Sequence, residues 1–179
     1  MNTDNCQIAG ETIDYGPCAF MDIYHPDQVF SSIDRTGRYA YSNQPNIIVW
    51  NMAQFATALI PLMPDAEAAI DRFTQNIHAM PDLINTYWLR EFGAKIGLKT
   101  PQSEDFDLIS ALLTLMAEGQ ADFTNTFHTL ANGKPENQFT DPHPFEDWRQ
   151  KWQMRLKDEA DPHLLMQSKN PALIPRNHK

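Results

Sequence analysis

Residues 46–60 limit what this chain can fold into more than any other stretch, because their apolar side chains cover almost every side of a helix. Pro45 precedes the stretch and Pro61 follows it, so both ends of the helix are marked. A helix that is apolar around most of its circumference is normally buried inside a domain. We therefore expect this segment to be the central helix of a globular domain, with Trp50 and Phe55 as core residues rather than as a ligand-binding pair.

Helical spacing of apolar residues continues through the rest of the chain. Asp65 and Ser103 are suited to cap helix starts, Pro81 to break or kink a helix and Gly97 to end one. The expected helices span residues 66–79, 82–96, 104–118, 120–132 and 144–158, with a short helix at most over 162–168. The sequence therefore predicts a mainly α fold.

Composition excludes several classes of function. The chain has 179 residues, which is room for one domain, and a formal net charge of −9. Such a charge argues against binding to nucleic acid or to an anionic membrane surface. The longest apolar stretch, residues 47–63, is too often interrupted by polar residues to span a bilayer.

The residues that bind metals through sulfur or nitrogen are sparse. Two cysteines, Cys6 and Cys18, do not make a disulfide framework or a zinc site, and they favour a reducing, cytoplasmic setting. None of the six histidines is three or four residues from another. A zinc enzyme is therefore not expected.

The first sixteen residues predict a β-hairpin. Residues 6–9 and 12–13 resemble short strands, and residues 10–11 (Gly-Glu) form a turn between them. The open ends of a hairpin lie together, with paired Cα atoms about 4.5–5.5 Å apart. The residues just outside the two strands are therefore expected to face the same small volume.

Three oxygen-bearing side chains flank this predicted hairpin. Asp4 and Asn5 precede the first strand, and Asp14 follows the second. Oxygen ligands of this kind suit Mg²⁺, which takes one or two carboxylates and completes its coordination with phosphate oxygens and water. Asp and Asn are also common turn residues, so a purely structural role is the more common explanation of the pattern taken alone.

Residues 17–45 have no helical period, and their aromatic residues indicate an ordered surface loop. Arg35 and Arg38 could hold a phosphate group or the carboxylate of Asp4. The alternative is that both arginines are solvated or paired with a local acid such as Asp34.

Several motifs together resemble one known family, that of selenoprotein O. They are residues 1–5 (MNTDN), 12–17 (TIDYGP), 20–22 (FMD), 34–41 (DRTGRYAY), 44–45 (QP) and 170–177 (NPALIPRN). The resemblance spans nearly the whole chain. It implies a protein-kinase-like fold and a protein adenylyltransferase activity, which moves AMP from ATP to Ser, Thr or Tyr hydroxyls of proteins.

The resemblance also implies roles for the three oxygen-bearing residues. Asp4 would accept the proton of the attacking hydroxyl, Asn5 and Asp14 would bind Mg²⁺ or Mn²⁺, and Asp14 would contact ATP through the metal. The Asn directly follows the catalytic Asp, unlike the spacing in ordinary kinases, and Asp14-Tyr15-Gly16 stands where kinases have Asp-Phe-Gly.

The expected organisation follows from the same resemblance. Residues 1–45 would hold the catalytic loop, the metal-binding hairpin and the activation segment, and residues 46–179 the helical C-terminal lobe. The family's ATP-binding lobe lies upstream of the catalytic loop, so we expect this chain to be a fragment that is inactive alone. The alternatives are a non-enzymatic helical interaction module and an ordinary protein kinase relative.

Overall fold

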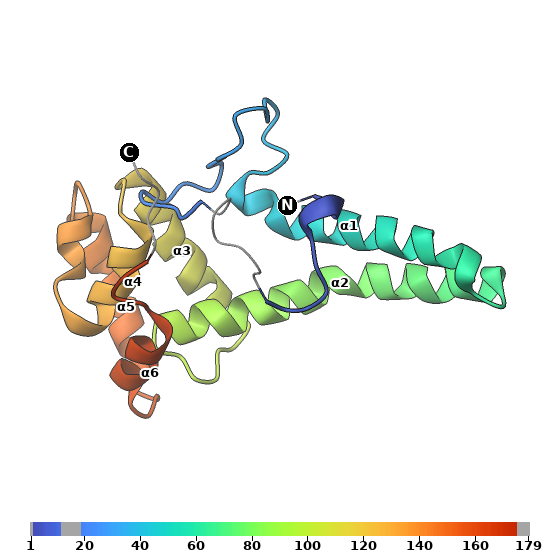
Figure 1. The fold of residues 1–179 in the computed structure, drawn as a ribbon. Helices are drawn as coiled ribbons and strands as arrows, with labels where there is room; N and C mark the ends of the chain where they lie inside the picture. Colours follow the sequence, from blue (N-terminus) through green and yellow to red (C-terminus); the bar gives the residue numbers. More distant parts are fainter. Residues whose placement is uncertain (1, 12–18, 175–179) are drawn as a thin grey trace. The chain divides into compact units, whose positions relative to one another are not determined.

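The computed structural model describes residues 2–11 and 19–174, and these residues are mainly helical (Figure 1). The α-helices are α1 (Gln44–Leu59), α2 (Ala66–Lys95), α3 (Asp105–Glu118), α4 (Phe123–Asn132), α5 (His143–Leu156) and α6 (Pro162–Lys169). Short 3₁₀ helices are η1 (Thr3–Asn5), η2 (Tyr41–Asn43), η3 (Ile60–Leu62) and η4 (Pro135–Gln138). The described part of the chain has no β-strand, only an isolated bridge between Ile23 and Asp122. The prediction of a mainly α fold is confirmed.

The chain divides into two compact units. Unit 1 comprises Met1–Cys18 and Asp27–Thr86, and unit 2 comprises Ala19–Pro26 and Tyr87–Lys179. Helix α2 contributes its first part to unit 1 and its last part to unit 2. Among the helices of the described residues, none combines the length and the apolar character that crossing a bilayer requires.

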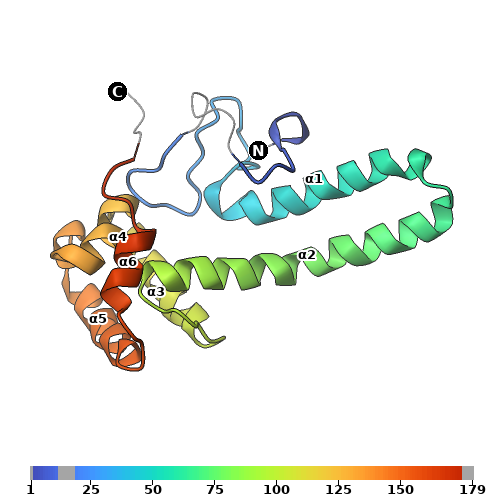
Figure 2. The same cartoon turned by 60° about the horizontal axis from the view of Figure 1, so that its bottom comes forward.

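Unit 1 is a helical hairpin with the N-terminal segment and a long loop. Helix α1 and the first part of α2 run side by side, joined by η3 (Figure 2). Asp65 caps α2, as expected, by accepting a hydrogen bond from the backbone N–H of Ala68 at 3.0 Å. The expected break at Pro81 is wrong, because α2 continues through it. Proline removes one N–H from the helical ladder, and the bonds on either side hold the helix together.

The burial of α1 differs from the prediction. Of its residues, Ile47 and Asn51 are buried, whereas Trp50 and Phe55 are each 41% exposed. A helix that is apolar all round can be buried only if neighbours cover every side. Unit 1 offers the first part of α2, the N-terminal segment and the loop, and these leave much of α1 open.

Unit 2 encloses a well-packed core. Helix α3 packs on α5, and α4 packs on α6. The largest fully buried side chains are Ile96, Leu98, Ile109, Leu112, Met116, Thr126, Phe127, Phe145 and Met166. The indole N–H groups of two buried tryptophans are hydrogen-bonded to backbone carbonyls. Trp148 donates to the carbonyl of Leu108 at 2.8 Å, and Trp152 donates to that of Ile96 at 2.7 Å.

Polar contacts fix the edges of unit 2. Arg155 on α5 donates two hydrogen bonds to the buried carboxylate of Asp105, at 2.9 and 3.0 Å. These bonds raise the pKa of Arg155. Asn170, the first residue of the C-terminal motif, donates to the carbonyl of Lys95 at 2.8 Å and accepts from its ammonium at 3.3 Å. These two bonds give Asn170 a structural role. Burial lowers the pKa of Lys95.

Candidate functional site

The N-terminal segment places Asp4 and Asn5 next to each other on η1, where both are exposed. The backbone N–H of Asn5 donates to the carbonyl of Asn2, and the N–H of Asn2 donates to the side-chain oxygen Oδ1 of Asn5. This reciprocal pair stabilises the short helix. An amide oxygen has two lone pairs, so Oδ1 of Asn5 retains one for a further partner.

The third predicted ligand, Asp14, lies outside the described residues, as does the second predicted strand, residues 12–13. The first predicted strand, residues 6–9, is not a strand, so the expected hairpin is not confirmed. Gly10 does adopt a left-handed φ of 73°, which is typical of a glycine in a turn.

Among the described residues, metal ligands of the usual types do not cluster. Across residues 2–11 and 19–174, no group of three or more His, Cys, Asp and Glu side chains could hold a metal ion. The predicted ligand set consists of Asn5 and Asp14 together with phosphate oxygens. It remains a prediction, because Asp14 lies outside the described residues. Its hard oxygen donors still fit Mg²⁺ or Mn²⁺.

The carboxylate of Asp34 organises segment 34–41 into a tight loop. It accepts hydrogen bonds from the backbone N–H groups of Thr36 at 3.1 Å, Arg38 at 3.1 Å and Tyr39 at 2.8 Å. These bonds, that of Tyr39 first, lower the pKa of Asp34. Gly37 supports the loop with a left-handed φ of 72°. The motif therefore has a clear structural function within unit 1.

The two arginines of this loop differ in their surroundings. The guanidinium of Arg38 lies over the ring of Trp50 on α1, 4.5 Å from its centroid. This cation–π contact joins the loop to the helix, so Arg38 contributes to packing within unit 1. Arg35 is exposed to solvent.

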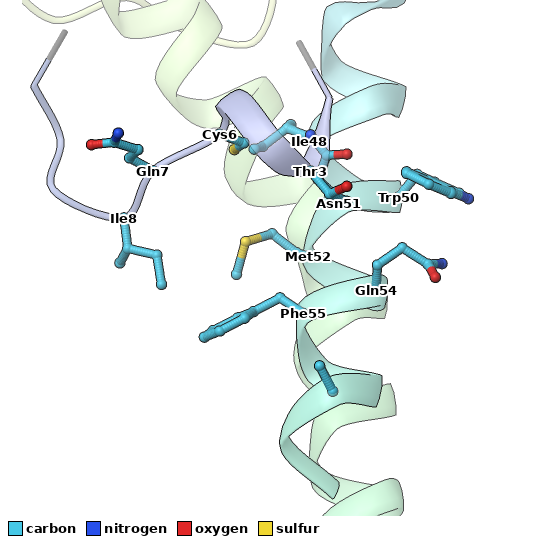
Figure 3. Close-up of a pocket in the computed structure, with 11 residues that line it drawn as sticks. Thr3, Cys6, Gln7, Ile8, Ile48, Trp50, Asn51, Met52, Gln54 and Phe55 are labelled. Atoms are coloured by element: carbon cyan, nitrogen blue, oxygen red, sulfur yellow. The ribbon is translucent and has the colours of Figure 1, made fainter. Parts of the chain in front are cut away.

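A cavity of about 520 Å³ lies between the N-terminal segment and α1, and Figure 3 shows its lining. Thr3 and Cys6, which flank Asp4 and Asn5, line it from one side. Asn51 lines it from α1 and is 4% exposed. Within the described part of the chain, neither the nitrogen nor the oxygen of its side-chain amide has a hydrogen-bond partner.

Sequence reasoning missed Asn51 as a residue of interest. No signal in the sequence singles it out, because the same helix also carries the amide residues Asn46 and Gln54. Buried polar groups are nearly always hydrogen-bonded, so an exception requires an explanation. Asn51 is one of the residues that line the cavity beside Asp4 and Asn5.

Comparison with known proteins identifies the family. The chain is 60% identical over 179 residues to the protein nucleotidyltransferase YdiU of Ruegeria sp. (strain TM1040) and 58% identical to that of Ruegeria pomeroyi. It is 49% identical over 185 residues to the protein of the same name from Halalkalibacterium halodurans. Each match covers the whole chain and 38% of the relative's length. Since residues 1–179 match the family described as Protein adenylyltransferase SelO, the chain belongs to that family.

Proposed function

We propose that this chain forms part of the catalytic centre of a protein adenylyltransferase that transfers AMP from ATP to Ser, Thr or Tyr hydroxyls of proteins. The family match over all 179 residues is the observation that carries the proposal. The exposed position of Asp4 and Asn5 on η1 supports it, because a group that meets a protein substrate must be accessible.

The reaction assigns a separate role to each residue. A substrate hydroxyl attacks the α-phosphorus of ATP, a new O–P bond forms, and the bond to the departing pyrophosphate breaks. The carboxylate of Asp4 accepts the hydroxyl proton. Asn5 and Asp14 would hold Mg²⁺ or Mn²⁺, with Asp14 reaching ATP through the metal. When bound, the metal neutralises charge on the phosphates and orients them.

The remaining parts of the proposal concern fold and location. Residues 1–45 would supply the catalytic loop, the metal-binding segment and the activation segment, and residues 46–179 a kinase-like helical C-terminal lobe. The α-helices of the described residues begin at Gln44, which supports the helical character proposed for residues 46–179. The cytoplasm is the proposed compartment, on the basis of cysteine usage.

Exchange of homologous segments tests the proposal. The segment of the Ruegeria sp. (strain TM1040) relative that matches this chain is replaced by residues 1–179, which are 60% identical to it. AMP transfer is then measured with ATP labelled at the α-phosphorus. We expect Asp4→Asn and Asp14→Asn to lower transfer by roughly 10²–10⁴-fold, as loss of a general base or metal ligand does. The control Glu11→Gln, in the same segment, should leave transfer nearly unchanged.

The outcomes separate the candidate functions. Transfer that survives Asp4→Asn or Asp14→Asn would overturn the assigned roles. Transfer of label from the γ-phosphorus instead would identify an ordinary protein kinase relative. The 179-residue chain alone matches only 38% of the relative, so we expect it to transfer little or no AMP. Robust transfer by the chain alone would contradict that expectation.

A further inference from the structure

Residues Ala19–Pro26 are a short part of unit 2 that lies, in the sequence, between two parts of unit 1. Met1–Cys18 precede this stretch and Asp27–Thr86 follow it. The stretch contains the motif 20–22 (FMD), to which the reaction proposed above assigns no role. Its contacts within unit 2 indicate what the motif does.

Two backbone hydrogen bonds attach the stretch to the connection between α3 and α4. The N–H of Phe123 donates to the carbonyl of Asp22 at 2.7 Å. The N–H of Tyr24 donates to the carbonyl of Ala121 at 2.9 Å. Together they form the isolated antiparallel bridge described above. A pair of such bonds fixes both the position and the direction of the chain.

Buried side chains strengthen this attachment. Met21 is 8% exposed and Tyr24 is 6% exposed. The ring of Tyr24 stacks on that of Phe123, with 5.8 Å between the centroids. Phe123 in turn contacts the fully buried ring of Phe127, at 5.1 Å between centroids. Tyr24 therefore belongs to the aromatic core of unit 2.

The connection that receives the stretch is tightly packed. Ala121 has no exposed surface, and its N–H donates to the carbonyl of Met116 at 2.9 Å. Gln120 has a left-handed φ of 53°, which a residue other than glycine keeps only where its surroundings hold it. A Cβ at Gly119 would lie 2.9 Å from the side chain of Phe139. The stretch is therefore held in a defined position within unit 2.

An attachment of this kind also restricts the chain that precedes it. Asp14 comes only five residues before Ala19 in the sequence. Fixing one end of a short segment reduces the number of conformations that the segment can adopt. A ligand carried on such a segment loses less conformational entropy when it binds a metal, so the affinity for the metal is higher.

We propose that residues 20–24 are an anchor that positions the segment carrying Asp14 for metal binding, and that Tyr24 is the side chain on which the anchor depends. Tyr24 is a positioning residue, which acts through the order of the segment rather than as a ligand. The proposal rests on the function proposed above, because it takes Asp14 as a metal ligand.

Binding of a metal–nucleotide complex to the exchanged Ruegeria protein tests the anchor. The probe is the Mn²⁺ complex of α,β-methylene ATP, which cannot be cleaved at the α-phosphorus, and calorimetry gives its Kd. Tyr24→Ala removes the stacked ring, whereas Tyr24→Phe keeps it. We expect the Kd to rise at least about fivefold in Tyr24→Ala and by less than about twofold in Tyr24→Phe.

Leu130→Ala is the matched control for a general loss of stability. Leu130 on α4 is 5% exposed, close to the 6% of Tyr24. The Tm should fall in both alanine variants, because each empties part of the core of unit 2. The Kd should nevertheless change by less than about twofold in Leu130→Ala. Tyr24→Leu, which keeps apolar bulk but loses the stacked ring, takes the place of Tyr24→Ala if that variant does not fold.

Hydrogen exchange in the metal-free protein provides a second readout that needs no nucleotide. We expect the backbone amides of residues 12–18 to exchange at least about tenfold faster in Tyr24→Ala than in the parent protein. Leu130→Ala should leave their exchange nearly unchanged. Unchanged exchange in Tyr24→Ala would show that the anchor does not order this segment, and would overturn the proposal.

Asp14→Asn separates failure of the anchor from failure of the proposed function. A Kd that rises in Asp14→Asn but not in Tyr24→Ala would overturn the anchor and leave the metal role of Asp14 in place. A Kd that Asp14→Asn does not change would overturn both. Equal increases in Tyr24→Ala and Leu130→Ala would reduce the effect to lost stability and would also overturn the anchor.

Discussion

The two units of this chain bury their apolar residues to very different extents. Unit 2 encloses a core of fully buried side chains, among them Phe127 and Phe145. Unit 1 exposes large apolar residues along its helical hairpin, namely Trp50, Phe55, Leu62, Met63, Ile70 and Leu83. The difference shows that unit 2 closes a core of its own, whereas unit 1 leaves many apolar side chains of its helical hairpin exposed.

The largest expected effect comes from truncating a core phenylalanine in unit 2. Phe145 is fully buried, so Phe145→Ala should destabilise unit 2 by about 3–5 kcal/mol, from lost burial and the cavity left behind. Phe55→Ala in unit 1 should cost about 1 kcal/mol or less, because that side chain is already partly exposed. Urea unfolding followed by tryptophan fluorescence and circular dichroism measures both. Equal losses would remove the contrast between the units.

Two glycines with left-handed φ angles sharpen the same contrast. A Cβ at Gly97, in unit 2, would lie 2.9 Å from the Cβ of Pro162 and 3.2 Å from its carbonyl oxygen. Gly97→Ala should therefore cost about 2–4 kcal/mol, from backbone strain and overpacking. Gly10→Ala, in unit 1, should cost about 1–2 kcal/mol, because a Cβ there meets nothing within 4 Å and only the strain remains. Thermal unfolding of the two variants provides the comparison, and a larger loss for Gly10→Ala would contradict it.

The smallest expected effect concerns pH and the loop of unit 1. Backbone hydrogen bonds lower the pKa of Asp34 below its ordinary value of 3.8, so the folded loop favours the ionised carboxylate. The stabilisation is complete above the ordinary pKa and is lost as the pH falls through the lowered pKa. NMR signals of the backbone N–H groups of Thr36, Arg38 and Tyr39 should shift together with a midpoint below 3.8. Asp34→Asn should abolish this shared transition, and a midpoint above 3.8 would show that the hydrogen bonds do not stabilise the carboxylate.

Much of unit 2 could be predicted from the sequence because its signals are local. Apolar periodicity located α3 to α5, and Gly97 ends α2 with a left-handed φ of 89°, as expected of a C-terminal glycine. The expected cap at Ser103 is wrong, since Glu104 precedes α3 and has no side-chain capping bond. Asp122 takes the corresponding place before α4 and accepts from the N–H of Asn125 at 2.8 Å.

Unit 1 was harder to predict because its structure depends on what lies beside it. Periodicity predicted correctly that residues 46–60 are helical, but the burial of Trp50 and Phe55 requires neighbours that no local pattern encodes. Pro81 predicted an interruption of the helix, yet α2 continues through it. For the candidate site, the sequence identified Asp4 and Asn5 as neighbours, and their relation to Asp14 remains a prediction.

Hydrogen exchange of individual backbone amides tests the contrast between the units most directly. In the 179-residue chain, amides of α3 should exchange at least about 10²-fold more slowly than amides of α1, because few neighbours cover α1. In the exchanged Ruegeria protein, the amides of α1 should become as protected as those of α3. Equal protection of α1 and α3 in the 179-residue chain would contradict the account, since it would show that α1 needs no further polypeptide to be stable.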